Sequence, residues 1–165
     1  MIESARFKSP IGFLSILAVK EGVVKTSLEN GFMEDLNDWF QGHLGMGIVE
    51  GTDFTTEAKS QILNYLNGKR KLLDFPVVHF NTPFRKRVLK EERNIPYGQT
   101  RSYGEIAKMV GCPKAIRAVG SANANNPLPL YFPCHRIINS NGTLGGFGWG
   151  VDVKQYLLDL ESKSL

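Results

Sequence analysis

The segment Leu130-Tyr-Phe-Pro-Cys-His-Arg-Ile-Ile138 is the part of the chain from which its fold and function are best approached. It places a cysteine beside a histidine and an arginine, between apolar flanks. The thiolate is the reactive form of cysteine, and a neighbouring imidazole or positive charge lowers the thiol pKa from about 8.5. His135 and Arg136 offer both, so Cys134 is the candidate nucleophile.

Other interpretations of Cys134 stay open at this point. A buried cysteine often serves only as a small apolar side chain. A zinc site needs about four ligands, and the available cysteines and histidines show no paired spacing: Cys112, Cys134, His43, His79 and His135. In thiol proteases the cysteine and histidine come from distant parts of the chain, whereas here they are adjacent. Because adjacent side chains need not face each other, a third group must orient the imidazole.

Length and composition are those of an ordinary globular protein. The 165 residues allow one large or two small domains, with 42% apolar and 22% charged residues. No apolar run reaches the roughly 18 residues of a membrane span, and the N-terminus lacks a signal-peptide pattern, so we expect a cytoplasmic protein. Two cysteines make no disulfide framework. We expect free thiols, with a Cys112–Cys134 bridge as the alternative.

Basic residues are concentrated in the second half of the chain. Residues 1–75 carry 8 Lys and Arg against 10 Asp and Glu, a balance of −2, whereas residues 76–165 carry 12 against 6, a balance of +6. A basic half favours contact with a polyanion, above all nucleic acid. A solvated basic face is the alternative.

The first half is predicted to hold a small sheet and helices. Residues 5–28 alternate in a pattern typical of an antiparallel meander with two turns. Helices are predicted at 33–41 and after a cap at Thr55 or Thr56, ending at Gly68. The glycine-rich residues 42–51 indicate a loop or short edge strand, and 72–80 a strand or extended linker. We find no chemistry in this half and expect it to be a scaffold.

A domain boundary is predicted near residue 80, where the composition shifts. Thr82 as N-cap and Pro83 at the first helical position begin a helix that ends near Ile95-Pro-Tyr-Gly98. Ser102 and Glu105 match a capping box for the next helix.

A break at Gly111-Cys-Pro113 separates that helix from one predicted to run from Lys114 to about Asn123. The pair matches a helix-turn-helix, whose second helix can approach a DNA groove closely. An ordinary helical hairpin is the alternative. The second helix presents Arg117 among small residues: Ala115, Ala118, Gly120, Ser121, Ala122 and Ala124.

The segments that flank Cys134 are predicted to build its surroundings. Asn126 lies in a proline-interrupted loop that its side chain can tie together. The glycine-rich residues 143–150 suit either a pocket wall for a flat ligand or a surface loop. Asp152 is predicted to cap the last helix. Glu161 stands near the C-terminus of that helix, where the dipole disfavours a carboxylate, so we expect it to have a specific partner.

From about Ile95 to Glu161 these motifs, in this order, resemble the O6-alkylguanine-DNA alkyltransferases. The residues that carry the resemblance are Pro133-Cys-His-Arg-Ile137, Arg117-Ala-Val-Gly120, Asn126-Pro127, the Tyr97 to Tyr103 segment, the glycine-rich loop and Glu161. The resemblance implies an α/β (α+β) fold with two domains. Residues 1–80 would be a ribonuclease-H-like sheet-plus-helix domain, and 81–165 a mostly helical domain with the helix-turn-helix.

The resemblance also implies roles for single residues. Cys134 would accept the alkyl group, His135 would act as its base through a water, and Glu161 would orient His135. Asn126 would brace the loop, and Tyr103 would help to rotate the nucleotide and donate to the base. The DNA-binding residues would be Lys114, Arg117, Ala118, Ser121 and Ala122, and the substrate pocket would be formed by Pro129, Ile137, Phe147, Gly148 and Trp149. Arg136 is assigned to structural pairing.

The function implied is the irreversible, single-turnover transfer of alkyl groups from O6-alkylguanine, and from O4-alkylthymine, to Cys134 after base flipping. The partner would be duplex DNA bound through the minor groove by a monomer, with no cofactor, metal or membrane. Two alternatives are a lesion-binding protein without transfer, in which the acceptor cysteine is replaced, and a helix-turn-helix regulator that binds a specific sequence. Gly148 departs from the serine of some members, which leaves the range of alkyl sizes open.

Overall fold

The computed structural model describes residues 1–29, 42, 45 and 47–164. The helix predicted at 33–41 lies outside these residues. The chain divides into two compact units, Met1–His79 and Phe80–Leu165.

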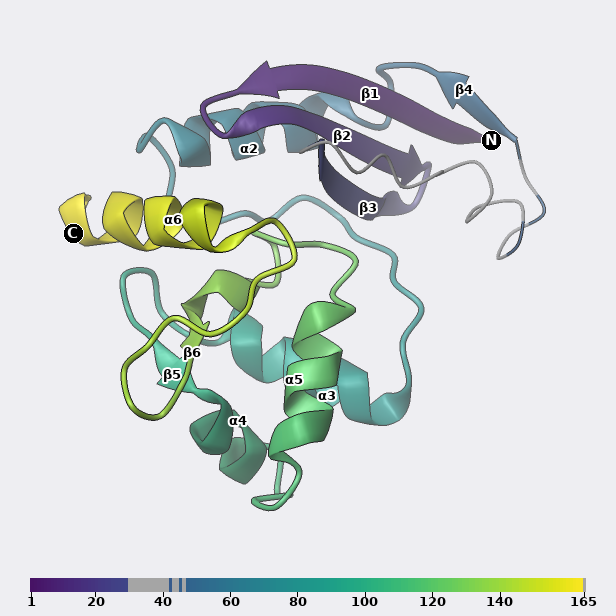
Figure 1. Ribbon diagram of the computed structural model, residues 1–165. Coiled ribbons are helices and arrows are strands. Elements are labelled where there is room, and N and C mark those ends of the chain that lie inside the picture. The colour runs from purple at the N-terminus through teal and green to yellow at the C-terminus, as the bar shows by residue number, and fades with distance from the viewer. Residues whose placement is uncertain (30–41, 43–44, 46, 165) are drawn as a thin grey trace. The chain divides into compact units, whose positions relative to one another are not determined.

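The first unit contains a four-stranded sheet in the order β3-β2-β1-β4 (Figure 1). Its strands are β1 (Ile2–Ser9), β2 (Gly12–Val19), β3 (Gly22–Glu29) and β4 (Ile48–Glu50). The pairs β1–β2 and β2–β3 are antiparallel, which confirms the predicted meander, and β4 is a short edge strand parallel to β1. Apolar side chains from successive strands, Ile2, Leu17 and Val24, meet in one buried cluster.

Helix α2 (Thr56–Leu66) completes the described part of this unit. Its predicted apolar face is buried through Ala58, Ile62, Tyr65 and Leu66. The extended residues 72–80 form no regular strand, but the backbone of Val23 in β3 bonds on both sides to this segment, accepting from Val78 N and donating to Pro76 O. No helix in the described ranges is long and apolar enough to cross a membrane.

The second unit begins with α3 (Pro83–Arg93), whose predicted cap is confirmed by the bond from Arg85 N–H to Thr82 Oγ1. Two short parallel strands, β5 (Arg101–Ser102) and β6 (Ile137–Ile138), lie side by side (Figure 1). The capping box of Ser102 and Glu105 is present at the start of α4 (Tyr103–Met109). Helices α3, α4 and α5 enclose one apolar core, made by Val88, Ile95, Ile106, Ala107, Val110, Val119, Ala122 and Ile137.

Helix α5 (Ile116–Ala124) begins two residues later than predicted. Lys114 belongs to the turn that precedes it, because the Ala115 N–H bonds to the Cys112 carbonyl and closes a turn over residues 112–115.

The last helix, α6 (Val151–Lys163), has Gly150 as its N-cap at φ 98°, a conformation that favours glycine. The prediction that Asp152 caps this helix is therefore wrong. Asp152 lies within the first turn, where its carboxylate still suits the helix dipole.

Candidate active site

Cys134 opens a single turn of 3₁₀ helix, η1 (Cys134–Arg136), that runs directly into β6. Its side chain is only 3% exposed. Asn126 ties the preceding loop together, since its amide donates to the Phe132 carbonyl at 2.9 Å and its oxygen accepts from Leu128 N–H at 2.9 Å. The bracing role predicted for Asn126 thus has a direct geometric basis. Within this loop Leu130 has a φ of 76°, unusual for a residue with a side chain.

Glu161 of α6 is the third group that the sequence analysis required to orient the His135 imidazole, and His135 and Arg136 are the specific partners expected for its carboxylate. Its Oε2 lies 2.6 Å from His135 Nε2, and Arg136 donates to both of its oxygens, from Nε to Oε1 at 2.8 Å and from Nη2 to Oε2 at 3.0 Å. Gly98 N–H donates to Oε1 at 3.0 Å. A buried carboxylate is stable when paired and hydrogen-bonded in this way, and the structural pairing predicted for Arg136 is confirmed.

This arrangement fixes the protonation states of the pair. Burial alone would raise the pKa of Glu161, but the hydrogen bonds from His135 and Arg136 and the Arg136 charge outweigh it, so the pKa is held well below its usual range. Burial lowers the pKa of His135 and outweighs the opposing influence of Glu161. The imidazole is therefore neutral. It donates Nε2–H to the carboxylate, which makes Nδ1 the basic nitrogen.

The Cys134 thiol is not ionised in the resting protein. Burial, and next the charge that Glu92 can carry, raise its pKa to about 12. Hydrogen bonding from Asn126 and the positive charge of Lys154 lower it, but by less. The thiol thus needs a base when it reacts, and a neutral imidazole such as that of His135, the next residue in the chain, has the chemistry of one.

Lys154 is a site residue that sequence reasoning missed. Its side chain is fully buried in α6, and its ammonium donates to the carbonyls of Ile137 at 2.6 Å and Gly146 at 3.3 Å, and also to that of Leu144. It thereby fastens the glycine-rich loop to the strand that follows Cys134. The sequence places Lys154 on the same helix face as Leu157 and Glu161, but its carbonyl partners lie in earlier segments that the helix pattern does not show.

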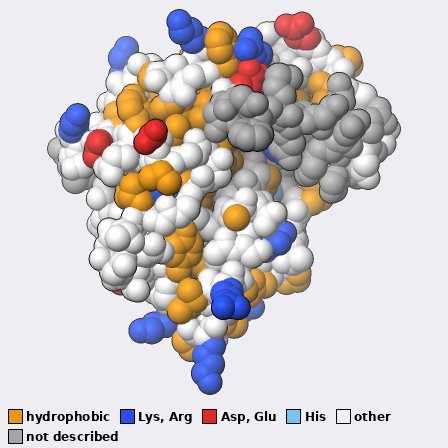
Figure 2. Space-filling model, viewed as in Figure 1, with side chains coloured by type: hydrophobic (Ala, Val, Ile, Leu, Met, Phe, Trp, Pro, Cys, Tyr) orange, Lys and Arg blue, Asp and Glu red, His pale blue; other side chains and the backbone are white. Residues whose placement is uncertain are grey.

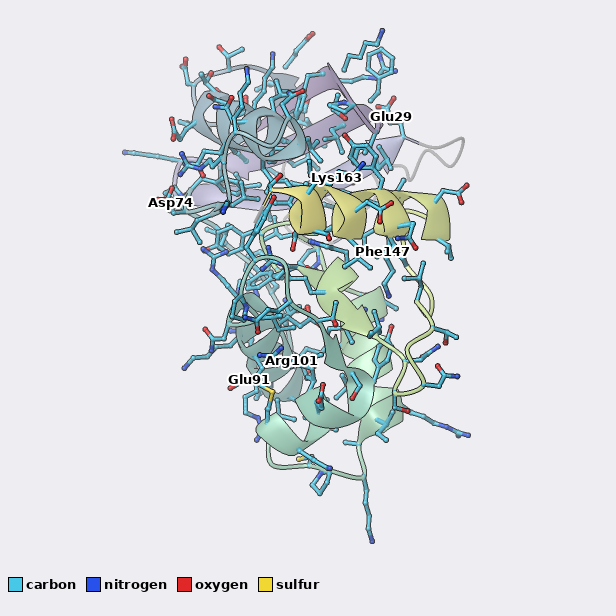
Figure 3. The ribbon with its side chains drawn as sticks, turned by 90° about the vertical axis from the view of Figure 1, so that its left-hand side faces the viewer. Glu29, Asp74, Glu91, Arg101, Phe147 and Lys163 are labelled. Carbon is cyan, nitrogen blue, oxygen red and sulfur yellow. The ribbon has the colours of Figure 1, made fainter. Side chains whose placement is uncertain are left out.

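The glycine-rich loop carries three of the predicted pocket residues. Phe147, labelled in Figure 3, and the buried Trp149 make an edge-to-face ring pair with centroids 6.2 Å apart. Gly148 between them is exposed. Of the other two, Pro129 is partly buried and Ile137 is fully buried in the helical core.

Tyr103, at the start of α4, lies close to this loop: a side chain at Gly145 would meet its ring at 3.4 Å. It is partly buried, and burial raises its pKa, opposed by a hydrogen bond with the Asn123 side chain. The phenol therefore keeps its proton and can donate it.

The surface of α5 differs in part from the prediction. Arg117, Ala118 and Ser121 are exposed, and Lys114 is exposed in the turn before the helix. Ala122, however, is only 1% exposed and packs in the helical core, so it cannot contact DNA directly. Figure 2 shows Lys and Arg side chains at the lower end of the view, where Figure 1 places α4, α5 and their turn.

The described residues also bear on the two alternatives raised for Cys134, a disulfide with Cys112 and a metal site. Cys112 and Cys134 are both free thiols, so no disulfide joins them. The described part of the chain holds no group of three or more His, Cys, Asp or Glu side chains that could bind a metal ion.

Comparisons with known proteins show which family this chain is similar to. The family described as 6-O-methylguanine DNA methyltransferase, DNA binding domain, matches residues 83–163. A methylated-DNA–protein-cysteine methyltransferase of Methanosarcina acetivorans is 41% identical over 95% of this chain and 96% of its own length. The constitutive enzyme of that name from Bacillus subtilis is 39% identical over 93% and 92%.

A solved structure extends the similarity to the whole fold and to a DNA complex. The OGT of Mycobacterium tuberculosis in complex with DNA is 33% identical, with a TM-score of 0.86 over 98% of this chain and 94% of that one. The similarity covers both units, the mixed α/β fold and nearly the full length of each relative. The chain therefore belongs to the methylated-DNA–protein-cysteine methyltransferase family and is an enzyme of that class.

Proposed function

We propose that Cys134 is the residue that accepts the alkyl group from O6-alkylguanine in duplex DNA. The observation that supports this most strongly is that the buried Cys134 is followed directly by His135, whose imidazole Glu161 holds at 2.6 Å. An orienting carboxylate, a base and an adjacent nucleophile form the arrangement by which enzymes activate a thiol. Cys112, the other free cysteine, lies in the turn before α5 and serves as the natural control.

The chemical step balances without a cofactor. The sulfur attacks the alkyl carbon, a C–S bond forms, and the bond from that carbon to O6 breaks with its electrons going to the guanine. The thiol proton passes to His135 through a water, Tyr103 gives its phenol proton to the leaving guanine, and the imidazolium returns a proton to the Tyr103 phenolate through solvent, so both side chains end neutral. Because a thioether has no easy reverse reaction, each protein molecule acts once.

A buried acceptor requires that the damaged base leave the helix. The alkyl carbon of a stacked guanine cannot reach a sulfur that is 3% exposed, so the nucleotide must be extruded. In this proposal α4 and α5 act as a helix-turn-helix that enters the minor groove. Arg117, exposed on α5, fills the space left in the stack, and Tyr103 helps to rotate the nucleotide. The small side chains Ala118 and Ser121 permit close approach.

The extruded base would bind beside the glycine-rich loop. Backbone groups of Cys134, Ile137 and Gly148 would bind its edge, while Pro129, Phe147 and Trp149 line the pocket. The same pocket would admit O4-alkylthymine. Residues 81–165 thus carry DNA binding and chemistry as a monomer, and residues 1–80 form a ribonuclease-H-like scaffold.

Nucleoside analysis of the DNA tests this function. A duplex with one O6-methylguanine is incubated with less protein than DNA, then digested and chromatographed. We expect one guanine restored per protein molecule and no further conversion with time. Continued conversion would contradict a single-turnover reaction, and binding without conversion would favour a lesion-recognition protein instead.

A further inference from the structure

Glu92 is a buried acid that the mechanism above does not use. It lies on α3 and is 0% exposed, and neither of its carboxyl oxygens has a hydrogen-bond partner among the described residues. Val88, four residues before it, and Ile95, three residues after it, both belong to the helical core. The side chain therefore points into the interior between α3, α4 and α5. A buried carboxylate without a partner costs several kilocalories per mole, so the group is retained as a neutral acid.

The core that Glu92 enters also contains Ile137, three residues after Cys134. The electrostatic influence of Glu92 reaches both the Cys134 thiol and the Tyr103 phenol, and in each case it raises the pKa. Helix α5 contributes the Asn123 side chain, which is buried and hydrogen-bonded with Tyr103. The carbonyl of Ile95, one turn beyond Glu92, accepts a 2.7 Å bond from Arg136 in the cysteine turn.

We propose that Glu92 is a positioning residue for alkyl transfer, which must stay protonated while Cys134 reacts and whose ionisation disfavours the thiolate and slows the reaction. This role rests on the proposed function of Cys134. It follows from the sign of the charges: a neutral acid leaves the thiolate undisturbed, whereas a second anion in the same unsolvated interior opposes it.

The proton of Glu92 is lost near the upper end of the physiological range. Burial raises the pKa of Glu92 to about 8 from its usual 4.5. The titratable groups within its influence are Tyr103 from α4 and Cys134 from η1, while α5 provides the uncharged Asn123. Lys154 from α6 acts on Cys134 with the opposite sign. Glu92 is thus neutral well below pH 8 and an anion well above it.

The test compares single-turnover rates of the wild type and Glu92→Gln from pH 6 to 9.5, with a duplex containing O6-methylguanine. Glutamine has the shape of the neutral acid but cannot ionise. We expect equal rates near pH 6 and a ratio of Glu92→Gln to wild type that climbs through pH 8. The ratio should reach about tenfold for each unit by which the Glu92 charge raises the thiol pKa. Changes in the DNA with pH cancel in this ratio. The matched control Glu91→Gln, one residue away and partly exposed, should follow the wild type.

A second measurement reports the proton itself. The infrared carbonyl band of a protonated carboxylic acid should be present in the wild type at pH 6, disappear as the pH rises through 8, and be missing from Glu92→Gln. A ratio that stays flat with pH, or absence of the band at pH 6, would overturn the role of Glu92 while leaving Cys134 as acceptor. If the wild type transfers no methyl group to Cys134 at any pH, the acceptor assignment fails, and the role of Glu92 with it.

Discussion

Arg136 binds Glu161 through two hydrogen bonds, one from Nε to Oε1 at 2.8 Å and one from Nη2 to Oε2 at 3.0 Å. The same carboxylate holds His135, the residue after the candidate nucleophile. The ion pair is buried on both sides, with the two side chains 8% and 1% exposed. Arg136 therefore keeps Glu161 ionised and in place, Glu161 orients His135, and burial keeps the imidazole neutral.

Replacing Arg136 should destabilise the protein, because it leaves the Glu161 charge buried without a compensating charge. We expect Arg136→Met to lower the free energy of unfolding by about 3–5 kcal/mol, measured by urea denaturation. Lysine cannot form the two hydrogen bonds that the guanidinium makes to the Glu161 carboxylate, so Arg136→Lys should recover only part of the lost free energy of unfolding. The matched control is Arg6→Met, which removes an exposed pair with Glu29 and should cost no more than about 1 kcal/mol. Equal losses at the two sites would contradict this interpretation.

Glu161→Gln tests the orientation of the base. An amide cannot match the carboxylate as an acceptor for Arg136 and His135, so the imidazole loses its fixed tautomer. We expect the single-turnover rate to fall on the order of a hundredfold or more, while DNA affinity measured by fluorescence anisotropy stays within about twofold. Asp159→Asn on the exposed side of α6 is the control and should leave the rate unchanged. A wild-type rate for Glu161→Gln would remove His135 from the mechanism.

Lys154→Met should slow transfer through two effects. It removes a positive charge that lowers the pKa of Cys134, and it releases the Ile137, Leu144 and Gly146 carbonyls from their common donor. A loss of about tenfold in rate corresponds to one unit of thiol pKa. Lys163→Met, an exposed change in the last turn of α6, should have no effect. Equal rates for the two variants would show that Lys154 does not act on the thiol.

Arg117→Ala should weaken DNA binding and slow transfer, because an exposed cation on α5 is lost. If Arg117 also contacts a phosphate, the slope of the logarithm of affinity against the logarithm of salt concentration should fall by about one. The measurement is a salt titration of binding to a lesion duplex. Lys69→Ala, an exposed change in the first unit, is the control. An unchanged affinity and rate for Arg117→Ala would contradict the assignment of α5 to DNA.

Glu92 also makes stability depend on pH. Its pKa is about 8 in the folded protein and near 4.5 in the unfolded chain, so the folded state binds the extra proton between these values. The contribution of Glu92 to stability is fully present below pH 4.5 and is lost as the pH rises to about 8. Glu92→Gln should therefore gain stability relative to the wild type over this window, by up to about 1.4 kcal/mol per pH unit. Urea unfolding at pH 5 and pH 8 measures the difference, and a constant difference would contradict it.

Local rules predicted much of the fold from the sequence. The caps at Thr82 and Ser102 and the antiparallel meander follow from side-chain chemistry within a few residues, and the structure confirms them. The partner of Glu161 could be anticipated because a carboxylate at a helix C-terminus is unfavourable by itself. The start of α5 was misplaced because a turn closed at Ala115 competes with the helix, and pattern alone does not resolve that competition.

Residues whose surroundings come from distant segments escaped prediction. Glu92 stands in the charged run Lys90-Glu-Glu-Arg93, which is typical of an exposed helix face, yet packing of α4 and α5 against α3 buries it. Lys154 escaped in the same way, because its carbonyl partners lie 8 to 17 residues earlier in the chain. Ala122 was assigned to the DNA surface from its size, although its position on α5 faces the core.

The acceptor role of Cys134 is the central claim, and intact-protein mass with peptide mapping tests it most directly. Wild type, Cys134→Ala and Cys112→Ser are each incubated with an equimolar duplex that contains one O6-methylguanine. The account predicts a gain of one methyl mass in the wild type and in Cys112→Ser, located on the peptide that contains Cys134 and saturating at one equivalent, with no gain in Cys134→Ala. A methyl group found on any other residue, or a wild type that binds the lesion without gaining mass, would contradict it.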